Sequence, residues 1–299
     1  SAIQEQRRAR HWSIFFKTLG FAFLFLVLFI SMGWLDKKET HLSGGKHTAL
    51  VDLQGVIAAD TQASADNLIP SLQEAFKDNG TKGVILRINS PGGSPVQAGQ
   101  INDEIVRLRF KYPAIPLYVV VEDICASGGY YVAAAADKIF VDKASLIGSI
   151  GVLMDGFGFT GTMEKLGVER RLVTAGANKG FMDPFSAARP DQEEYAKQML
   201  AEIHQQFIDI VKQGRGKRLK ETPDTFSGLV WNGQKGVEMG LADGYGSLES
   251  VARDVIKAEE IIDFTVKEGF ADRLAKRFGA GVVSALPEFS AKGGGVNLR

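Results

Sequence analysis

Two glycine-rich turns hold the side chains of this chain that could do chemistry. The first, residues 89–94, follows the apolar run GVILRI, and the second, residues 126–130, follows PLYVVVEDI. Glycine lets backbone N–H groups approach a ligand closely, which suits an anion or a developing oxyanion. Ser127 is the better nucleophile candidate, because a serine at a strand–helix junction is exposed and faces the N–H groups of the helix. Ser90 and Ser94 compete with it, an N-cap role would also explain Ser127, and each turn could be an ordinary tight turn.

A serine nucleophile needs a base, and histidine is poorly placed to supply one. Three of the four histidines lie near the N-terminus. His204 sits beside the apolar stripe of a predicted helix, where a structural role is the better interpretation. Cys125 lacks a histidine partner too and is interpreted as a buried strand-end residue. No cluster of His, Cys and Asp has metal-ligand spacing, and neither turn matches a nucleotide-binding loop, so we expect no metal and no cofactor.

Lysine can replace histidine as the base where an apolar site disfavours its charged form. The candidates beyond the N-terminal region are Lys138, Lys143, Lys165 and Lys179. Lys138 and Lys143 have aspartate neighbours in the sequence and should be solvated. Lys179 lies in AGANKGFMDPF, a loop of small and apolar residues. Composition alone still favours an ordinary surface lysine at that position.

Strand-like and helical patterns alternate along most of the chain. The apolar runs TALVDLQGVI, GVILRINS, PLYVVVEDI and KIFVDKASLIGSIGVL have the length and composition of buried strands. Their alternation with helical patterns predicts an α/β domain with a largely parallel sheet. Both glycine-rich turns then fall at the carboxyl ends of strands, where such sheets bind ligands. Residues 190–213 predict an amphipathic helix that begins at Pro190.

The N-terminal region predicts a membrane anchor over residues 14–35. Residues 18–35 carry no charge, and Arg7, Arg8, Arg10 and Lys17 precede them, which places the N-terminus in the cytoplasm by the positive-inside rule. A cleaved signal peptide is the alternative, although the apolar run is longer than such segments usually are. The expected organisation is a cytoplasmic segment (1–13), a transmembrane anchor (14–35), a tether (36–47), a catalytic domain (48–262) and a partly mobile C-terminal extension (263–299).

Composition narrows the classes of function. The chain has 299 residues, with 35 Lys and Arg against 35 Asp and Glu, so no net charge points to nucleic acid as a partner. Its single cysteine excludes an intramolecular disulfide framework and any cysteine-rich metal site. The length is sufficient for one large domain with a sizeable core.

Five segments together resemble the signal peptide peptidases of the protease IV family, which are bacterial membrane-anchored serine proteases. In the family's order they are INSPGGS, ASGGYYVAAAADKI, SLIGSIGVL, NKGFMDPF and VWNGQKGVEMGLADGYGSLE. The resemblance covers residues from about 48 to 255, plus the anchor. The second segment is long and specific, whereas related crotonase-type folds share the glycine pair of the first.

The resemblance implies a role for each matching residue. Ser127 matches the nucleophile of the family and Lys179 its general base, in the family's short form where one chain supplies both groups. Ser149 matches a serine that orients the lysine, and the backbone N–H groups of Gly93 and Gly128 match the oxyanion donors. The resemblance also implies a crotonase/Clp-like fold of repeated ββα units, preceded by the transmembrane helix, and a ring-shaped homo-oligomer. The sequence TAGANKG departs from the more polar residues of many relatives, so the resemblance does not define the substrate pocket.

The function expected from this resemblance is hydrolysis of peptide bonds by a Ser-Lys dyad. Activity should rise with pH, because the lysine must be uncharged to accept the serine proton. The expected substrates are apolar signal peptides left in the membrane, with membrane lipid as a second partner and no nucleic acid. The expected location is the bacterial inner membrane, with the catalytic domain on the periplasmic side.

Two other functions stay open at the level of sequence. A non-catalytic membrane scaffold could keep the same fold with a vestigial Ser-Lys pair. A crotonase-like acyl-CoA enzyme would share the glycine-lined oxyanion pocket, although it would be expected in the cytoplasm. Labelling of Ser127 by an active-site serine probe distinguishes the protease from the scaffold.

Overall fold

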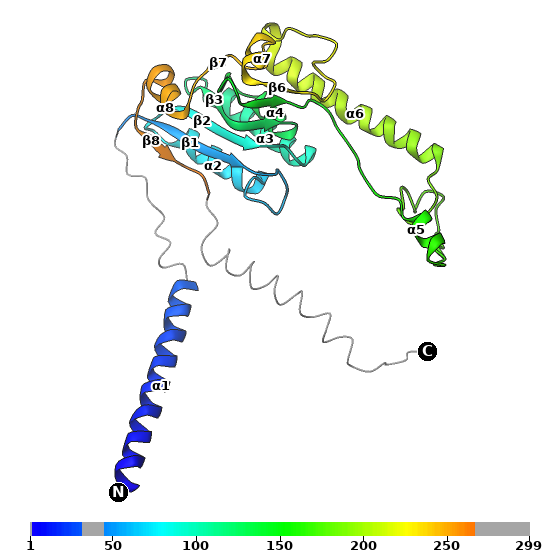
Figure 1. Ribbon diagram of the computed structural model, residues 1–299. Coiled ribbons are helices and arrows are strands. Elements are labelled where there is room, and N and C mark those ends of the chain that lie inside the picture. The colour runs from blue at the N-terminus through cyan, green and yellow to red at the C-terminus, as the bar shows by residue number, and fades with distance from the viewer. Residues whose placement is uncertain (1, 32–44, 267–299) are drawn as a thin grey trace. The chain divides into compact units, whose positions relative to one another are not determined.

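A computed structural model describes residues 2–31 and 45–266 of the chain, which divides into two compact units (Figure 1). One unit is Ser43–Val266, and the expected catalytic domain, 48–262, lies within it. Phe264, just past that expected boundary, still donates its N–H to the carbonyl oxygen of Leu50 at 2.8 Å. The expected C-terminal extension lies outside the described residues from residue 267 onward.

The N-terminal helix α1 (Ala2–Ser31) belongs to the other unit. Its aromatic side chains pack on one another, with the rings of Trp12 and Phe16 stacked at 5.7 Å between centroids. Among the residues described, no helix has both the length and the apolar character needed to cross a membrane. The predicted span, 14–35, includes residues 32–35, which lie outside the described part of the chain.

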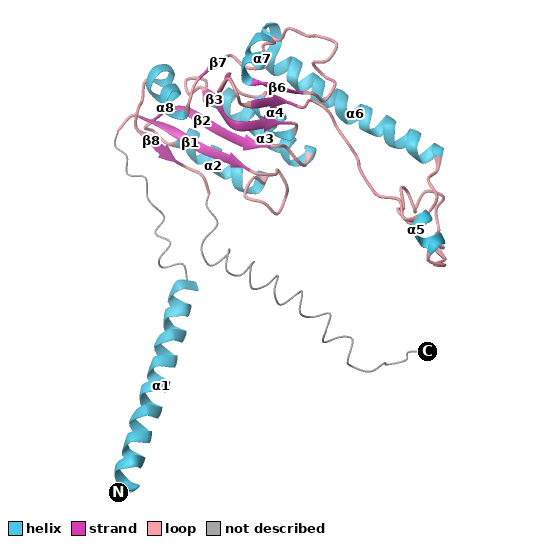
Figure 2. Ribbon diagram, viewed as in Figure 1, coloured by secondary structure: helices cyan, strands magenta, loops and turns pink. Residues whose placement is uncertain are grey.

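An eight-stranded sheet forms the centre of the unit Ser43–Val266 (Figure 2). Its strands are β1 (His47–Gln54), β2 (Thr81–Ser90), β3 (Leu117–Ala126), β4 (Lys138–Val141), β5 (Leu146–Gly148), β6 (Val230–Asn232), β7 (Gly244–Tyr245) and β8 (Ile261–Asp263). The main order is β6-β5-β3-β2-β1-β8, and β4 pairs with both β3 and β7. Every pairing is parallel except β5 with β6, which confirms the expected α/β class with a largely parallel sheet.

Helices connect the parallel strands, because a parallel pair needs a crossover segment between its members. They are α2 (Ala65–Lys77), α3 (Pro95–Lys111) and α4 (Gly128–Ala133), which follow β1, β2 and β3 in turn. The repeated unit along this stretch is therefore one strand and one helix, and not the expected ββα. Two strands follow each other directly only where β5 comes after β4.

The run predicted as a single strand from residue 138 to 153 is two strands. The carboxylate of Asp142 accepts from Ala144 N–H at 2.8 Å, and Asp142 N–H donates to Ser145 Oγ at 3.0 Å, so a tight turn separates them. The turn moves the chain from one half of β3 to the other, since β4 pairs with 118–120 and β5 pairs with 124–126. This change places the end of β5 beside the end of β3.

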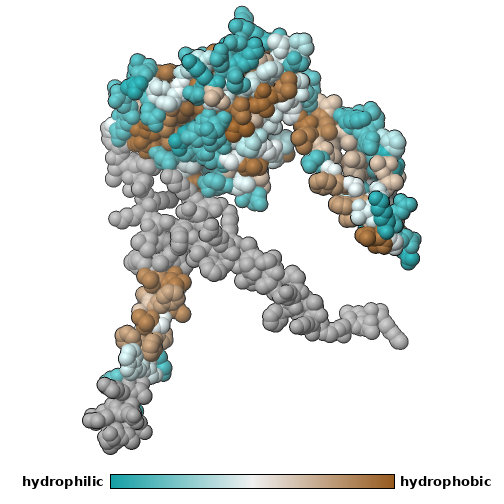
Figure 3. All heavy atoms as spheres, viewed as in Figure 1, coloured by the Kyte–Doolittle hydropathy of each residue, from teal (hydrophilic) through white to brown (hydrophobic). Residues whose placement is uncertain are grey.

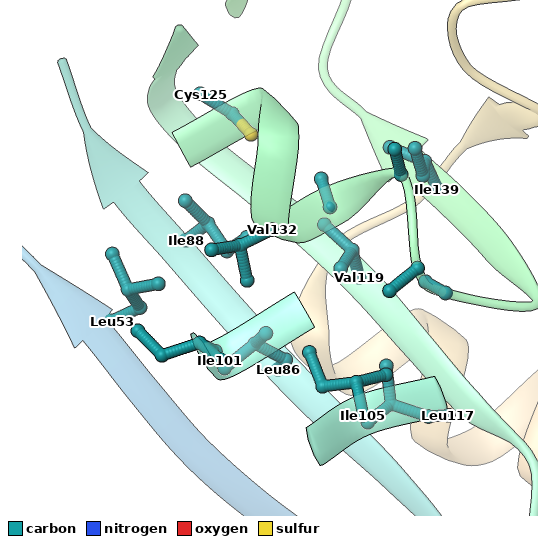
Figure 4. Close-up of a cluster of buried hydrophobic side chains, with 14 of the residues drawn as sticks. Leu53, Leu86, Ile88, Ile101, Ile105, Leu117, Val119, Cys125, Val132 and Ile139 are labelled. Carbon is teal, nitrogen blue, oxygen red and sulfur yellow. The ribbon is translucent and has the colours of Figure 1, made fainter. Parts of the chain in front are cut away.

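The main core lies between the sheet and its crossover helices (Figure 4). Ile101 and Ile105 of α3 and Val132 of α4 point at Leu86, Ile88 and Val119 of the strands, and all six are fully buried. A smaller cluster on the opposite face packs against α8 (Leu248–Ser250) and the π-helical turn η2 (Val251–Ile256). Burial on both faces explains why the strand sequences are almost continuously apolar.

An extended arm leaves the sheet after β5. The arm comprises residues 152–200, which include α5 (Thr160–Lys165) and the N-terminal half of α6 (Pro190–Arg215). Figure 1 shows α5 and the start of α6 projecting from the sheet, while the end of α6 returns to it. The helix predicted over 190–213 is confirmed as α6. Short elements, η1 (Gly216–Arg218) and α7 (Gly233–Glu238), complete the unit.

Candidate active site

Ser127 occupies a strained turn between β3 and α4. Its backbone has φ 52° and ψ −123°, a conformation that side-chain-bearing residues rarely adopt. Ser127 N–H donates to Gly148 O at 2.9 Å, and Ser127 O accepts from Tyr131 N–H at 2.9 Å. The side chain of Ser127 makes no capping hydrogen bond to α4. The N-cap role that could have explained this serine is therefore absent, and its hydroxyl is left for other chemistry.

The two glycine turns meet beside Ser127. A Cβ built on Gly92 would lie 2.7 Å from both Gly128 N and Ser127 Cβ, and one built on Gly128 would lie 3.2 Å from Gly93 N. Neither Gly93 N–H nor Gly128 N–H donates a hydrogen bond to another described residue. Two unpaired backbone donors close to a serine form the arrangement that stabilises a developing oxyanion.

The competing nucleophiles have structural roles. Ser90 is fully buried, and its Oγ accepts from Gly92 N–H at 3.1 Å. Ser94 is the N-cap of α3, and its Oγ accepts from Gln97 N–H at 3.4 Å. Complete burial raises the pKa of the Cys125 thiol well above its usual range, so a thiolate is disfavoured there. Ser127 is the candidate that remains.

Ser149 lies one residue beyond the end of β5, where that strand runs beside the end of β3. It also has a positive φ, 50°, and its N–H donates to Leu229 O at 2.8 Å. The preceding residue, Gly148, is the one whose carbonyl accepts from Ser127 N–H. The pairing of β3 with β5 thus brings Ser149 close to Ser127 although 22 positions separate them in the sequence.

A cavity of about 520 Å³ opens at this junction. Four of the five sequence-predicted site residues line it, namely Gly93, Ser127, Gly128 and Ser149. One wall is aromatic, because Tyr131 of α4 and Phe207 of α6 pack with ring centroids 5.1 Å apart. Burial, with a smaller contribution from Asp103, raises the pKa of Tyr131, which keeps its phenol neutral. The cavity combines an apolar wall with a serine and two free donors.

Lys179, the fifth predicted residue, does not line this cavity. It is exposed on the loop between α5 and α6, and that loop is fixed to the start of α6 by a hydrogen bond from Met182 N–H to Gln192 Oε1 at 3.2 Å. Ile203, the first residue of α6 that lines the cavity, lies eleven residues beyond Gln192, or about 16.5 Å at 1.5 Å per residue. Within one chain the structure therefore does not bring Lys179 to Ser127.

No other candidate base lines the cavity. Lys138, Lys143 and Lys165 are exposed elsewhere, and Lys143 Nζ lies 5.9 Å from the ring centroid of Tyr245. His204 donates from Nε2 to Ile150 O at 3.0 Å, which is the structural role expected of it. Among the described residues, no group of three His, Cys, Asp or Glu could hold a metal ion.

Several cavity residues were missed by reasoning from the sequence. They are Pro95, Tyr131, Gly151, Val152, Leu153, Ile203, Gln206, Phe207, Ser227 and Gly228. Ile203 and Phe207 belong to the apolar stripe of the predicted helix, so periodicity marked them as buried without indicating a site. Nothing local marks Gly228, whose Cα would lie 3.0 Å from a Cβ built on Gly151. Only the pairing of β5 with β6 brings that segment to the cavity.

Comparisons with known proteins identify one matching family and several relatives. The model of peptidase family S49 matches residues 109–261. A provisionally named signal peptide peptidase, SppA, of Enterococcus faecium is 31% identical over 77% of this chain and 70% of its own length. Protease 4 of Haemophilus influenzae is 31% identical over 77% of this chain and 37% of its own length.

A third relative carries a different kind of name. A protein of Brucella abortus named as the Na(+)/H(+) antiporter NhaA is 44% identical over 61% of this chain, which spans only 25% of that protein's length. Its name describes a protein about four times longer than the matched segment and does not extend to this chain. The family model covers more than half of the chain, including Ser127 and Ser149, whereas Gly93 and Pro95 of the cavity lie before the matched segment. The chain belongs to peptidase family S49.

Proposed function

We propose that this chain is a serine peptidase with Ser127 as its nucleophile and the N–H groups of Gly93 and Gly128 as its oxyanion donors. The observation that carries the proposal is the position of Ser127, at a strained turn beside two unpaired donors and a cavity. Membership of family S49 supports the same reaction class. A peptide carbonyl whose oxygen sits between the two donors would present its carbon to Ser127 Oγ.

The general base is Lys179 of a neighbouring subunit. The lining of the cavity contains no lysine or histidine, and the loop that carries Lys179 is tied to Gln192, which lies about 16.5 Å of helix before Ile203, the first residue of α6 in the cavity wall. A lysine side chain cannot span that separation, whereas an arm that projects from the sheet can reach a second copy. A closed ring lets each arm serve the next subunit in turn, and head-to-tail contacts form such a ring when the rotation between subunits closes.

The surface of the arm supports such a contact. Large apolar side chains are exposed along it, with Val173 at 94% and Leu153 at 78% exposure, and others at Phe157, Leu166 and Val168. Figure 3 shows apolar surface gathered on this part of the molecule. Exposed apolar patches of this kind mark interaction surfaces in soluble domains. The ring would bury them.

The reaction then follows from the chemistry of a Ser-Lys pair. Neutral Lys179 Nζ accepts the proton of Ser127 Oγ while Oγ bonds to the peptide carbonyl carbon, and the carbonyl oxygen becomes an oxyanion. Collapse of this intermediate breaks the C–N bond, and Lys179 returns the proton to the leaving amine. Water hydrolyses the acyl-enzyme by the same steps. Ser149, on the cavity wall, would accept or donate a hydrogen bond that orients Lys179.

The proposed substrates are apolar signal peptides, and the proposed location is the bacterial inner membrane with the catalytic unit on the periplasmic side. The apolar wall of the cavity suits apolar side chains. The uncharged run of residues 18–35 and the arginines before it support an N-terminal anchor. A relative bears the name of a signal peptide peptidase, and an anchored enzyme would meet peptides left in the same membrane.

Complementation between two inactive variants tests the proposal. Ser127→Ala and Lys179→Ala should each abolish cleavage of an apolar peptide by the detergent-solubilised chain. If the base comes from a neighbour, mixing the two variants under subunit exchange should restore part of the wild-type turnover. Lys165→Ala is the control, because this exposed arm lysine should leave activity unchanged. If mixed oligomers of the two variants form and still restore no turnover, the shared site is contradicted.

A fluorophosphonate probe separates the peptidase from a non-catalytic scaffold. The peptidase should be labelled at Ser127, and the Ser127→Ala variant should not. Absence of labelling in an intact oligomer reconstituted in lipid would favour the scaffold.

A further inference from the structure

The loop that carries Lys179 is tied to α6 by a buried polar side chain. Gln192, in the first turn of α6, is only 7% exposed, and its Oε1 accepts the N–H of Met182 at 3.2 Å. Glutamine is rarely buried in a helix on the outside of a domain unless its amide is used. The hydrogen bond of this buried amide therefore holds the backbone of Met182, three residues after Lys179.

The backbone that Gln192 holds is strained. Met182 has φ 52°, a left-handed conformation that is unfavourable for a residue with a side chain. Such residues persist where the surroundings fix them, and they cluster at functional sites. The hydrogen bond to Gln192 is one of the contacts that fixes this one.

Further contacts fix the loop on either side of Lys179. The ring of Phe181 meets that of Tyr195 edge-on at 5.8 Å, and Arg189 donates to Ala177 O at 3.2 Å. Asp183 accepts from Ser186 Oγ at 2.6 Å. Lys179 itself contributes its N–H to Gly176 O at 3.1 Å, but its Nζ forms no ion pair with a described residue. The loop is thus held at several points while its lysine head remains available.

We propose that Gln192 is a positioning residue that sets the place of Lys179 Nζ when the arm meets a neighbouring Ser127. The inference rests on the proposed function, in which Lys179 is the base. A base must lie within hydrogen-bond reach of the proton that it removes, and a displacement of about 1 Å can lower a rate by about a hundredfold. Loss of the Gln192 bond would let Met182 relax and shift the residues that precede it.

Three substitutions at this position test the inference in the full-length oligomer. Gln192→Leu keeps the volume but removes the acceptor, and Gln192→Asn keeps the amide but shortens its reach by one methylene. Both should lower kcat about tenfold to hundredfold on an apolar peptide, with KM and oligomer size unchanged. Gln192→Glu keeps an acceptor oxygen at the same reach and should retain most of the wild-type kcat. Gln198→Leu, at an exposed glutamine of the same helix, is the matched control and should match wild type.

The outcomes separate positioning from mere stability. Wild-type kcat in both Gln192→Leu and Gln192→Asn at a temperature where they are folded would overturn the inference, even if their unfolding temperature fell. An equal loss in Gln192→Glu would also overturn it, since the acceptor would then not be what matters. If Lys179→Ala keeps turnover, the proposed base fails instead. If Lys179→Ala is inactive and the Gln192 variants are not, only the positioning role fails.

Discussion

The backbone N–H of Ser127 donates to the carbonyl oxygen of Gly148 at 2.9 Å, and this one bond joins the two strand ends that build the site. It holds the candidate nucleophile against the turn that carries Ser149. Both Ser127 and Ser149 have positive φ angles, so two strained serines face one cavity. Strain concentrated at one junction of a regular sheet is typical of functional sites.

Gly93 and Gly128, the proposed oxyanion donors, should respond differently to the same substitution. A Cβ on Gly128 would be 3.2 Å from Gly93 N, close enough to crowd the space of the oxyanion, without a clash under 3 Å. We expect Gly128→Ala to fold and to lower kcat about 100-fold to 1000-fold, as the loss of an oxyanion donor does. A Cβ on Gly93 would lie 2.1 Å from Ile57 O at φ 149°, so Gly93→Ala should fail to fold. Peptide turnover and thermal unfolding of both variants check this contrast.

Replacing Ser127 by glycine should relieve the backbone strain at this position and so stabilise the folded state. Glycine adopts φ 52° without cost, whereas alanine keeps the Cβ that makes this conformation unfavourable. We expect Ser127→Gly to exceed Ser127→Ala in free energy of unfolding by about 1 kcal/mol. Both variants should be inactive. Equal stability of the two in urea titration would show that the turn stores no strain.

The buried thiol of Cys125 should be unreactive in the folded protein. Burial raises the pKa of Cys125 and removes it from solvent, so thiol reagents should not react at pH 8. We expect no modification and no loss of turnover on exposure of the native chain to iodoacetamide. In denaturant, one thiol per chain should react, because the sequence contains one cysteine. Inactivation that parallels modification of Cys125 would contradict its burial.

Short sequence patterns predicted those parts of the candidate site that consist of single strands, turns and helices. The strand preceding Ser127, the glycine turns and the helix from Pro190 are all encoded by apolar periodicity and turn residues over short windows. The split of the predicted strand at Asp142 was missed, because continuous apolarity cannot show which half of β3 each piece pairs with. That split is what brings Ser149 to Ser127.

The position of Lys179 could not be predicted in the same way. The segment NKGFMDPF pointed to Lys179 as the candidate base. Its distance from Ser127 depends on where the arm projects from the sheet, and no short sequence pattern encodes that direction. Leu153 ends a run predicted as buried strand, yet it is exposed in this chain, as is Val173 further along the arm. Sequence reveals that a side chain is apolar but not whether the surface that covers it belongs to the same chain.

The ion pairs at the C-terminal end of α6 should make the stability of the fold sensitive to acid. The side chain of Arg215 is fully buried and donates to Asp243 at 2.8 Å, and Arg218 donates to the same carboxylate at 3.1 Å. Burial alone would raise the pKa of Asp243, but the hydrogen bond and charge of Arg215, with smaller contributions from Ile139 N–H and Arg218, outweigh it and lower the pKa. The carboxylate therefore stabilises the folded state wherever it is ionised.

The lowered pKa of Asp243 determines how stability changes with pH. A carboxyl whose pKa is lower when folded contributes fully above its unfolded value, about 3.9, and the contribution disappears as pH falls through the folded value. We expect the unfolding temperature to be steady near neutrality and to fall below about pH 4. Asp243→Asn should lower the free energy of unfolding by about 3–5 kcal/mol at pH 7, because it leaves Arg215 buried without its anion. The gap between the variant and wild type should narrow as pH falls below 4, and a gap that stays constant down to pH 2 would exclude Asp243 as the group responsible.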